Sequence, residues 1–297
     1  MGTSPKQQIK PRKAHSEPNA HLVAGIILVA PSMHEDDFLA LLVASGGDLV
    51  AHHPDRSFPV VLRVGCAGST TLVSQRSPLR VAPADGISTV VARGVSTNGQ
   101  WALFVSQAEN LVTNDANGYR DVFIRDLKAG TNLLVSVATN GFSVSHASYD
   151  PVMSWDARYV AFVSPSSNLV SGDANILADV FRRDLLTGNT VLVSATTPSG
   201  AAASPSISAA GNRVAFDRNN QIYAWDSGSG VFGANISASG SRAIISPNGN
   251  LVAFFKAAAS VQSAQIGLWR LTNNAVSTIT TSAGGLRGFS PDGGWIL

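Results

Sequence analysis

A tight turn followed by a short apolar strand recurs along the chain, and this repetition constrains the fold more than any other feature. One copy is Ser246-Pro-Asn-Gly-Asn-Leu-Val-Ala-Phe254. In such a turn, Asn or Asp bonds its own backbone and glycine accepts a positive φ. Five copies begin at Ser96, Ser154, Ser208, Ser246 and Ser290, and a weaker one begins near Ala44. Their spacing averages about 49 residues, within the period range of propeller blades.

A second element follows the turn in each repeat. Asp121-Val-Phe-Ile-Arg-Asp126 matches Asp179-Val-Phe-Arg-Arg-Asp184, and both continue through a glycine into a run ending in Leu-Val-Ser. This pattern predicts a strand, a hairpin and a second strand. Eroded copies begin at Pro59, Gln221 and Gln265. With one strand after the turn and a fourth before the next turn, each repeat would supply a four-stranded antiparallel blade.

Composition also favours an all-β fold. The 297 residues include only three glutamates and five lysines, and the chain is rich in Ala, Ser, Gly, Asn, Asp and Val. Glu and Lys favour helices, whereas Val favours strands and the small polar residues favour turns. We therefore predict an all-β β-propeller of about six four-stranded blades. Its last repeat is truncated within the first strand, at Leu297.

Charge and apolar patterning exclude several functional classes. The net charge is +2 and basic residues do not alternate with aromatic ones, so nothing indicates nucleic-acid binding. No apolar run reaches the roughly 18 residues of a membrane span. The single cysteine, Cys66, excludes an intrachain disulfide framework and a multi-cysteine zinc site. No cofactor is expected, apart from the calcium alternative considered below.

The Ser-Pro-Asp-Gly type of turn, the Val-Ala-Phe strand and the Asp-Val-Phe-x-Arg-Asp-Leu hairpin together resemble the TolB-like, WD-repeat-like β-propeller repeats of bacterial proteins. The resemblance covers residues 44–297, with repeats starting near 44, 96, 154, 208, 246 and 290. It implies a propeller, commonly six- or seven-bladed, that serves as a binding platform or as the non-catalytic part of a larger protein. It also favours a periplasmic or secreted location over the cytoplasm.

The N-terminal residues do not show the repeat. Residues 1–20 are polar and basic, and we expect a disordered tail. Residues 21–43 contain the apolar run His21-Leu-Val-Ala-Gly-Ile-Ile-Leu-Val-Ala30. This segment is either a secretory signal with a cleavage site near Ala30-Pro-Ser32 or a source of strands that close the last blade. If neither end closes the ring, the chain is an open fragment.

One acidic pattern occurs in two successive repeats and has the alternating oxygen groups of a calcium loop. Ca²⁺ takes six to eight oxygen ligands, although the pattern lacks the terminal glutamate of an EF-hand. Asx turns that stabilise the loop account for the same residues without a metal, and we favour this structural interpretation. The candidate ligands are Asp115, Asn117 and Asp121 in one repeat and Asp173, Asn175 and Asp179 in the next.

Other reactive residues do not form a recognisable catalytic set. His34-Glu-Asp-Asp37 and His52-His53-x-Asp55 are interpreted as solvated surface clusters, because adjacent strand residues point to opposite faces. No Gly-x-Ser-x-Gly nucleophile motif is present, and Cys66 occupies an ordinary hairpin position. We expect Asp126 and Asp184, which recur at one repeat position, to anchor hairpins.

These observations favour a non-catalytic binding or scaffold protein of the bacterial envelope, with a protein, peptide or glycan partner held by loops at the ends of the central channel. The alternative is the propeller portion of a larger hydrolase or lyase whose catalytic region is absent from this chain. A truncated gene product without activity is a third interpretation. Fold alone does not separate these alternatives.

Overall fold

The computed structural model describes residues 61–64, 69–72, 84–194, 200–232, 240–256, 264–281 and 286–296. These residues form β-strands and loops without a helix, and no helical segment among them could cross a membrane. Residues 1–60 and Cys66 lie outside the described part. Predictions for the basic tail, the segment 21–43, the acidic group at 34–37 and the His52–His53 pair therefore concern residues outside it.

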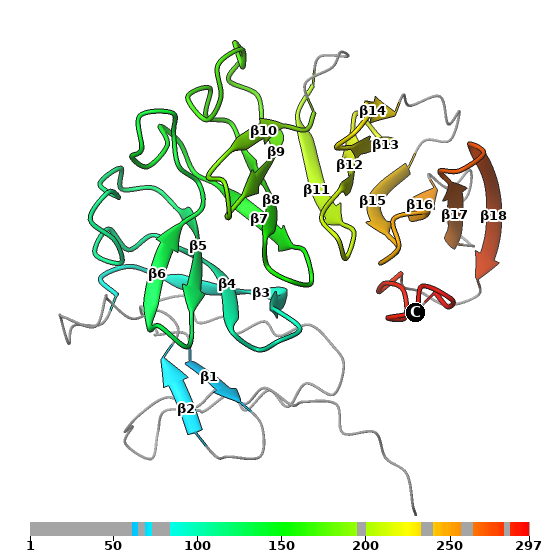
Figure 1. Cartoon of the computed structure of the whole chain (residues 1–297). Helices are drawn as coiled ribbons and strands as arrows, with labels where there is room; N and C mark the ends of the chain where they lie inside the picture. Colours follow the sequence, from blue (N-terminus) through cyan, green and yellow to red (C-terminus); the bar gives the residue numbers. More distant parts are fainter. Residues whose placement is uncertain are drawn as a thin grey trace, which may run out of the picture.

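Four antiparallel sheets of four strands follow one another along the chain. They lie side by side along an arc, with the first strand of each sheet on the inside and the last on the outside (Figure 1). We call these sheets blades I to IV. Blade I comprises β3 (Ser88–Val95), β4 (Trp101–Ser106), β5 (Asp121–Asp126) and β6 (Thr131–Leu134). Blade II comprises β7 (Tyr149–Met153), β8 (Tyr159–Ser164), β9 (Asp179–Asp184) and β10 (Thr190–Leu192). Blade III comprises β11 (Ala202–Ile207), β12 (Arg213–Arg218), β13 (Gln221–Asp226) and β14 (Gly230–Phe232). Blade IV comprises β15 (Gly240–Ile245), β16 (Leu251–Lys256), β17 (Ala264–Arg270) and β18 (Ala275–Thr281).

Two smaller pieces flank these blades. The hairpin β1 (Val61–Val64) and β2 (Ser69–Leu72) is antiparallel, at the position where the eroded repeat copy predicted strand, turn and strand. After blade IV, Phe289 pairs with Ile296 in an isolated bridge. The predicted all-β architecture of four-stranded antiparallel blades is thus confirmed for four blades. Among the described residues the sheets do not close into a ring, so the predicted count of six blades is not confirmed.

The blade begins one strand earlier than the sequence repeat. The sequence repeat places the strand before each serine turn in the preceding blade, but β3 pairs with β4 across the Ser96 turn, and β7 pairs with β8 across the Ser154 turn. The serine turn is therefore the hairpin between the first two strands of one blade. A turn motif in the sequence locates a hairpin but does not say which of its two strands starts a sheet.

The serine of each turn holds its hairpin together, and in blades I to IV this serine is buried. Ser154 is fully buried, and its Oγ donates a 2.6 Å hydrogen bond to Asp156 Oδ1 and accepts a 2.9 Å bond from the Tyr159 amide. The equivalent amide-to-Oγ bond is made in the turns that begin at Ser96, Ser208, Ser246 and Ser290. Because the hydroxyl satisfies a backbone amide that the tight turn leaves unpaired, the turn needs serine at this position.

Backbone hydrogen bonds between these turns link successive blades. The amide of Thr97 donates to the carbonyl of Trp155 at 2.9 Å, the amide of Trp155 to Ala209 at 3.0 Å, and the amide of Ala209 to Pro247 at 2.9 Å. Thr97, Trp155 and Ala209, each of which follows a turn serine, thus join their blades to the next one. Proline has no amide hydrogen, so Pro247 accepts a bond in this series and cannot donate one.

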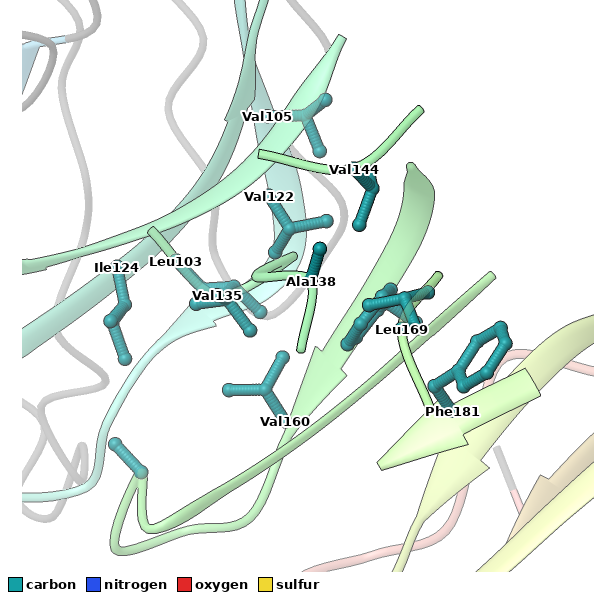
Figure 2. Close-up of a cluster of buried hydrophobic side chains, with 12 residues drawn as sticks. Leu103, Val105, Val122, Ile124, Val135, Ala138, Val144, Val160, Leu169 and Phe181 are labelled. Carbon is teal, nitrogen blue, oxygen red and sulfur yellow. The ribbon is translucent and has the colours of Figure 1, made fainter. Parts of the chain in front are cut away.

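Apolar side chains fill the spaces between blades. Figure 2 shows one such cluster, in which Leu103 and Ile124 of blade I lie close to Val160 of blade II. Similar clusters join blades II and III and blades III and IV. Both faces of blades II and III are therefore covered by neighbouring blades, which explains their near-continuous apolar strands in the sequence. Residues 286–296 cover the free face of blade IV, where Leu286 and Phe289 pack against Ala253 and Ile266.

A stacked aromatic pair connects the second and third strands in three blades. The ring centroids of Phe104 and Phe123 are 5.6 Å apart, and equivalent pairs join Phe162 to Phe181 and Phe216 to Tyr223. In blade IV the partner of Phe254 is Gly267. A Cβ atom on Gly267 would lie 2.2 Å from the Phe254 ring, so glycine leaves the room that this ring occupies.

Candidate functional site

A bulge occurs at the same place in the inner strand of blades II, III and IV. The register with the second strand shifts by one residue between Tyr149 and Val152, between Ala203 and Ser206 and between Ser241 and Ile244. The extra residue has a positive φ although it is not glycine, as seen at Asp150 (49°), Ser204 (53°) and Arg242 (54°). Non-glycine residues in this conformation are uncommon and concentrate at functional sites.

Blade I has a larger irregularity in its inner strand. Its register shifts between Val90 and Val95, and Arg93 has a φ of 54°. A Cβ atom on Gly288 would lie 2.3 Å from Arg93 Nη2. The Arg93 side chain thus reaches from blade I to the segment that follows blade IV, although their sheets share no strand pairing among the described residues.

These inner strands border a cavity of about 330 Å³. Its walls come from β3, β7 and β11, with Val105 of β4 and Arg120 of the β4–β5 loop at the side. Two bulge residues, Asp150 and Ser204, are in the lining, each followed by a proline. The cavity is thus bordered by three successive blades, with apolar walls and a few polar groups, as in many ligand sites.

The carboxylates near the cavity are held in surroundings that disfavour their charge. Burial raises the pKa of Asp150, and the nearby Arg120 guanidinium partly offsets this effect. Burial also raises the pKa of Asp217, whose carboxylate is hydrogen-bonded by Ser204 and by the Arg242 amide. Asp217 Oδ1 has no hydrogen-bond partner among the described residues. The region therefore combines strained backbone, the exposed carboxylate of Asp150, the half-buried carboxylate of Asp217 and one arginine, a set suited to binding a polar or charged partner.

Four of the six candidate calcium ligands lie in the β4–β5 and β8–β9 loops, and the other two, Asp121 and Asp179, are the first residues of β5 and β9. Asn117 Nδ2 donates a 2.6 Å bond to Asp121 Oδ2, and its Oδ1 accepts a 2.7 Å bond from the Tyr119 amide. Asn175 makes the same pair of bonds, to Asp179 and from Leu177. Both asparagines therefore form Asx turns that lead into the third strand. Among the described residues, no three carboxylate, imidazole or thiol groups converge on one point.

The final aspartate of each loop is buried and bonded to a serine of the same blade. Ser136 Oγ donates to Asp121 Oδ1 at 2.6 Å, and Ser194 Oγ donates to Asp179 Oδ1 at 2.5 Å. Burial raises the pKa of Asp121 to about 7, and the charge of Asp115 adds to this rise. The two aspartates thus have the same hydrogen-bonding role within their blades.

The first aspartate of each loop has an oxygen without a partner. Asp115 is 5% exposed and Asp173 is 7% exposed. Asp115 Oδ1 and Asp173 Oδ2 make no hydrogen bond to any described residue. An orphaned oxygen on a buried carboxylate is costly, and here it occurs twice at one position of the repeat.

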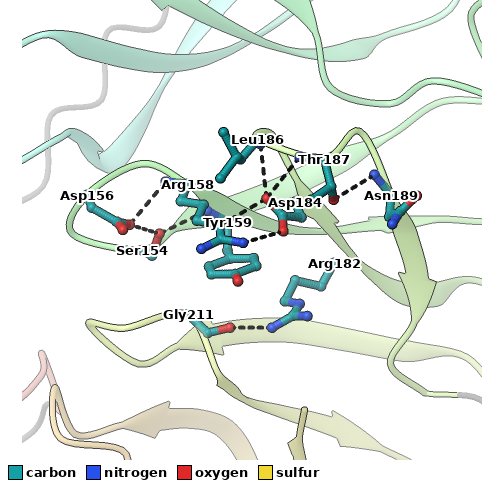
Figure 3. Close-up of polar contacts among 10 residues, drawn as sticks. All are labelled: Ser154, Asp156, Arg158, Tyr159, Arg182, Asp184, Leu186, Thr187, Asn189 and Gly211. Atoms are coloured by element: carbon teal, nitrogen blue, oxygen red, sulfur yellow. Dashed lines mark hydrogen bonds and ion pairs between the residues drawn. The ribbon is translucent and has the colours of Figure 1, made fainter.

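The hairpin aspartates anchor their turns, as the sequence predicted. Asp126 Oδ1 accepts bonds from the Lys128 and Ala129 amides at 2.8 and 2.9 Å. Asp184 Oδ1 accepts bonds from the Leu186 and Thr187 amides, while Oδ2 pairs with Arg158 at 3.0 Å (Figure 3). The ion pair and these amides lower the pKa of Asp184 to about 2. These groups stay ionised at neutral pH and are already occupied by structural bonds.

Sequence reasoning did not find the bulge residues. Asp150, Ser204 and Arg242 have no common side-chain chemistry. None of the three is glycine, the residue type whose recurrence would have indicated a positive φ at this position of the repeat. One signal was present in two repeats, because Pro151 and Pro205 both lie three residues before a turn serine. Nothing in the sequence indicated that Arg218 of blade III forms an ion pair with Asp179 of blade II, because the two residues are far apart along the chain.

Comparisons with known proteins find similarity at the level of structure. No protein-family model matches the chain, and a search of curated proteins finds no match. Solved structures similar to this chain include TolB from Acinetobacter baumannii, with 17% identity and a TM-score of 0.46, covering 80% of this chain and 52% of that one. A putative TolB from Agrobacterium tumefaciens has 17% identity and a TM-score of 0.46, covering 85% of this chain and 82% of that one. Dipeptidyl peptidase 4 from Porphyromonas gingivalis has 13% identity and a TM-score of 0.49, covering 79% of this chain and 38% of that one. This chain thus spans about half the length of the first of these structures. TolB proteins are among the structures that this chain is similar to, as the repeat motifs predicted.

Proposed function

We propose that this protein is a non-catalytic binding or scaffold protein that holds a protein or peptide partner at the cavity bordered by β3, β7 and β11. The observation that supports this proposal is the coincidence of that cavity with the bulge residues Asp150 and Ser204. Two successive blades place a non-glycine residue of positive φ at the same edge of the cavity. Such a backbone is maintained at a cost, and partner binding gives the bulges a role.

The polar groups indicate what part of a partner would bind. Asp150 and Arg120 provide one negative and one positive group at the cavity, and Tyr149 adds an aromatic surface. Extended peptide segments present backbone amides, carbonyls and side chains of both charges, which such a mixed site can pair. A glycan partner, by contrast, would depend on stacking and hydroxyl bonds more than on these two charges.

The experiment compares capture of envelope proteins by the wild-type chain and by two cavity variants. Asp150→Asn removes the charge while keeping a residue type that tolerates positive φ, and Arg120→Ala removes the cation. We expect both to lose a captured partner that cross-links to the wild-type protein. Lys128→Ala, in the exposed β5–β6 hairpin, is the matched control and should retain it.

A cleavage assay on the purified chain distinguishes this proposal from the alternative, in which the chain is the propeller portion of a hydrolase or lyase. If the chain is a binding protein, we expect it not to cleave peptide or polysaccharide substrates. A partner retained equally by all the variants would contradict the cavity as its site. The periplasmic or secreted location expected from the resemblance stays a prediction, which fractionation of cells producing the full chain would test.

A further inference from the structure

The inner strands of the blades carry more positive than negative charge. The bulge residue of blade IV is Arg242, and the irregular inner strand of blade I has Arg93 in the same positive-φ conformation, whereas blade II has Asp150. Strands β3, β7, β11 and β15 contain no other charged residue. The inner strands thus present two guanidinium groups and one carboxylate.

Two more arginines flank these strands. Arg120 lines the cavity from the β4–β5 loop. Arg287 follows blade IV, where Arg287-Gly-Phe-Ser290 repeats the order Arg93-Gly-Val-Ser96 of blade I. The Arg93 side chain reaches this second segment, since its Nη2 lies 2.3 Å from where a Cβ atom on Gly288 would be. The contact brings the two Arg-Gly segments together from the two ends of the arc of blades (Figure 1).

Both arginines of the inner strands are next to the lining of the cavity. Ala92 belongs to the lining and directly precedes Arg93. Arg242 is connected to the lining through Asp217, because the Arg242 amide and the Ser204 side chain both bond the Asp217 carboxylate, and Ser204 lines the cavity. Arg93 therefore lies at the β3 wall of the cavity, and Arg242 lies beside its β11 wall.

None of these four arginines forms an ion pair with another described residue. All four are exposed, and the ion pairs within the described part of the chain belong to Arg158, Arg213 and Arg218. The carboxylates at the cavity are Asp150 and Asp217, so guanidinium groups outnumber them by four to two. Unpaired charges of one sign around a cavity create a potential that attracts the opposite sign.

The lining between these charges is mostly apolar. It includes Val90, Val91, Pro151, Val152 and Pro205. A polysaccharide presents hydroxyl groups along its whole length, whereas a peptide can place apolar side chains between charged ones. A carboxylate also matches the guanidinium fork, with which it forms two parallel hydrogen bonds. Apolar walls flanked by arginines therefore favour a peptide that combines acidic and apolar residues.

We propose that the cavity holds an acidic, extended peptide segment, whose carboxylates pair with Arg93, Arg120 and Arg242 and whose apolar side chains contact the valines and prolines of the walls. This inference rests on the proposed function, because it specifies the partner of the same cavity. Arg287 adds to the positive potential. Asp150 accepts a backbone amide of the segment, so its replacement is still expected to weaken binding.

The test measures binding of labelled synthetic peptides to the full chain by fluorescence anisotropy. Three peptides share one length and the same apolar residues, with glutamate, glutamine or lysine at the polar positions. We expect the glutamate peptide to bind about tenfold more tightly than the glutamine peptide, because it gains charge-assisted hydrogen bonds. The lysine peptide should bind most weakly. Added salt should weaken the binding of the glutamate peptide far more than that of the glutamine peptide.

Variants of the arginines locate the charge effect. Arg93→Gln and Arg242→Gln should each weaken the glutamate peptide by about tenfold and change the glutamine peptide by less than about twofold. Arg242→Lys keeps the charge and should retain part of the affinity. Arg270→Gln, the same change at an exposed arginine of β17, is the matched control and should bind as the wild type does. Circular dichroism checks folding, and the Arg242 variants still test the site if Arg93→Gln does not fold.

The outcomes separate this inference from the proposed function. Equal affinity for the three peptides, lost in Arg120→Ala, would overturn the acidic preference and leave the cavity as a peptide site. A glutamate peptide bound equally well by Arg120→Ala, Arg93→Gln and Arg242→Gln would contradict both proposals. Alginate oligosaccharides that bind more tightly than the glutamate peptide would overturn the choice of a peptide. Absence of binding by the glutamate peptide would overturn this inference alone, because capture of envelope proteins tests the proposed function separately.

Discussion

Arg218 of blade III donates a 2.7 Å hydrogen bond from Nη2 to Asp179 Oδ1 of blade II. The same Nη2 donates to the Ser194 carbonyl at 2.9 Å. Both side chains of the ion pair are almost fully buried, at 5% and 4% exposed. This pair therefore joins two blades through charge in an interface that is otherwise apolar, and removing either partner would leave the other charge buried.

Arg218→Met should strongly destabilise the protein. The substitution keeps much of the side-chain volume but leaves Asp179 without its cation, which typically costs about 3–5 kcal/mol. Urea unfolding at neutral pH measures the loss. The double variant Asp179→Asn with Arg218→Met should recover part of it, because no buried charge then remains. A loss no larger than that of a surface substitution would contradict the role given to this pair.

Ser154→Ala should weaken the hairpin between β7 and β8. The substitution leaves the Tyr159 amide without the buried acceptor that Ser154 Oγ supplies at 2.9 Å. Leaving a buried donor unsatisfied costs about 1–3 kcal/mol, which thermal or urea unfolding would detect. The exposed Ser167 provides the comparison, since Ser167→Ala should change stability by less than about 0.5 kcal/mol.

Gly211→Ala should destabilise more than Gly141→Ala. Both glycines have a positive φ, 71° and 85°, so alanine costs about 1–2 kcal/mol at either position. A Cβ atom on Gly211 would also lie 2.3 Å from the Tyr159 ring, whereas one on Gly141 meets nothing within 4 Å. Overpacking adds about 1–3 kcal/mol at Gly211. Equal losses in parallel urea titrations would show that the Tyr159 ring moves aside.

Neighbouring side chains restrict the space around the Tyr159 ring, which supports the larger loss of stability expected for Gly211→Ala. The Arg182 guanidinium lies between the rings of Tyr159 and Trp225, at 4.4 and 4.5 Å from their centroids. Its Nη1 also donates a 2.7 Å bond to the Gly211 carbonyl (Figure 3). Displacing Tyr159 would therefore disturb the stacked arginine between blades II and III.

Stability should fall in acid through the Asp184–Arg158 pair. The pKa of Asp184 is lowered to about 2 in the folded protein from 3.8, so the folded state binds fewer protons than the unfolded state between these values. The resulting stabilisation is complete above about pH 4 and is lost as the pH falls toward 2. Arg158→Ala should flatten this part of a profile of urea midpoints against pH. Arg270→Ala, which removes an exposed arginine elsewhere, should leave its slope unchanged.

Features that depend on residues close in sequence were predictable. The serine turns, the Asp126 and Asp184 hairpins and the alternation of strands follow from local hydrogen bonds and from apolar runs. A repeated motif also makes each local prediction stronger, because several copies must satisfy the same geometry. These elements account for the four described blades.

Features that depend on contacts between blades were not predictable. Arg218 and Asp179 are 39 residues apart, and the motif around Arg218 contains nothing that specifies a partner in blade II. The bulges at Asp150, Ser204 and Arg242 lie in the inner strands, which face the neighbouring blades, and no shared residue type marks them in the sequence. Which strand starts a blade likewise depends on how the strands pair into sheets, and the order of the motifs along the chain does not determine that pairing.

The bonds between successive serine turns have an evolutionary consequence. Each link from Thr97 to Trp155, from Trp155 to Ala209 and from Ala209 to Pro247 uses only main-chain atoms, so it places no demand on the donor except that it is not proline. A blade copied by tandem duplication would find matching donors and acceptors on both neighbours at once. The side chains around it could then diverge, as they have at Trp155 and Ala209, without breaking the junction. Such an array can gain or lose whole blades while the sequences of its repeats diverge.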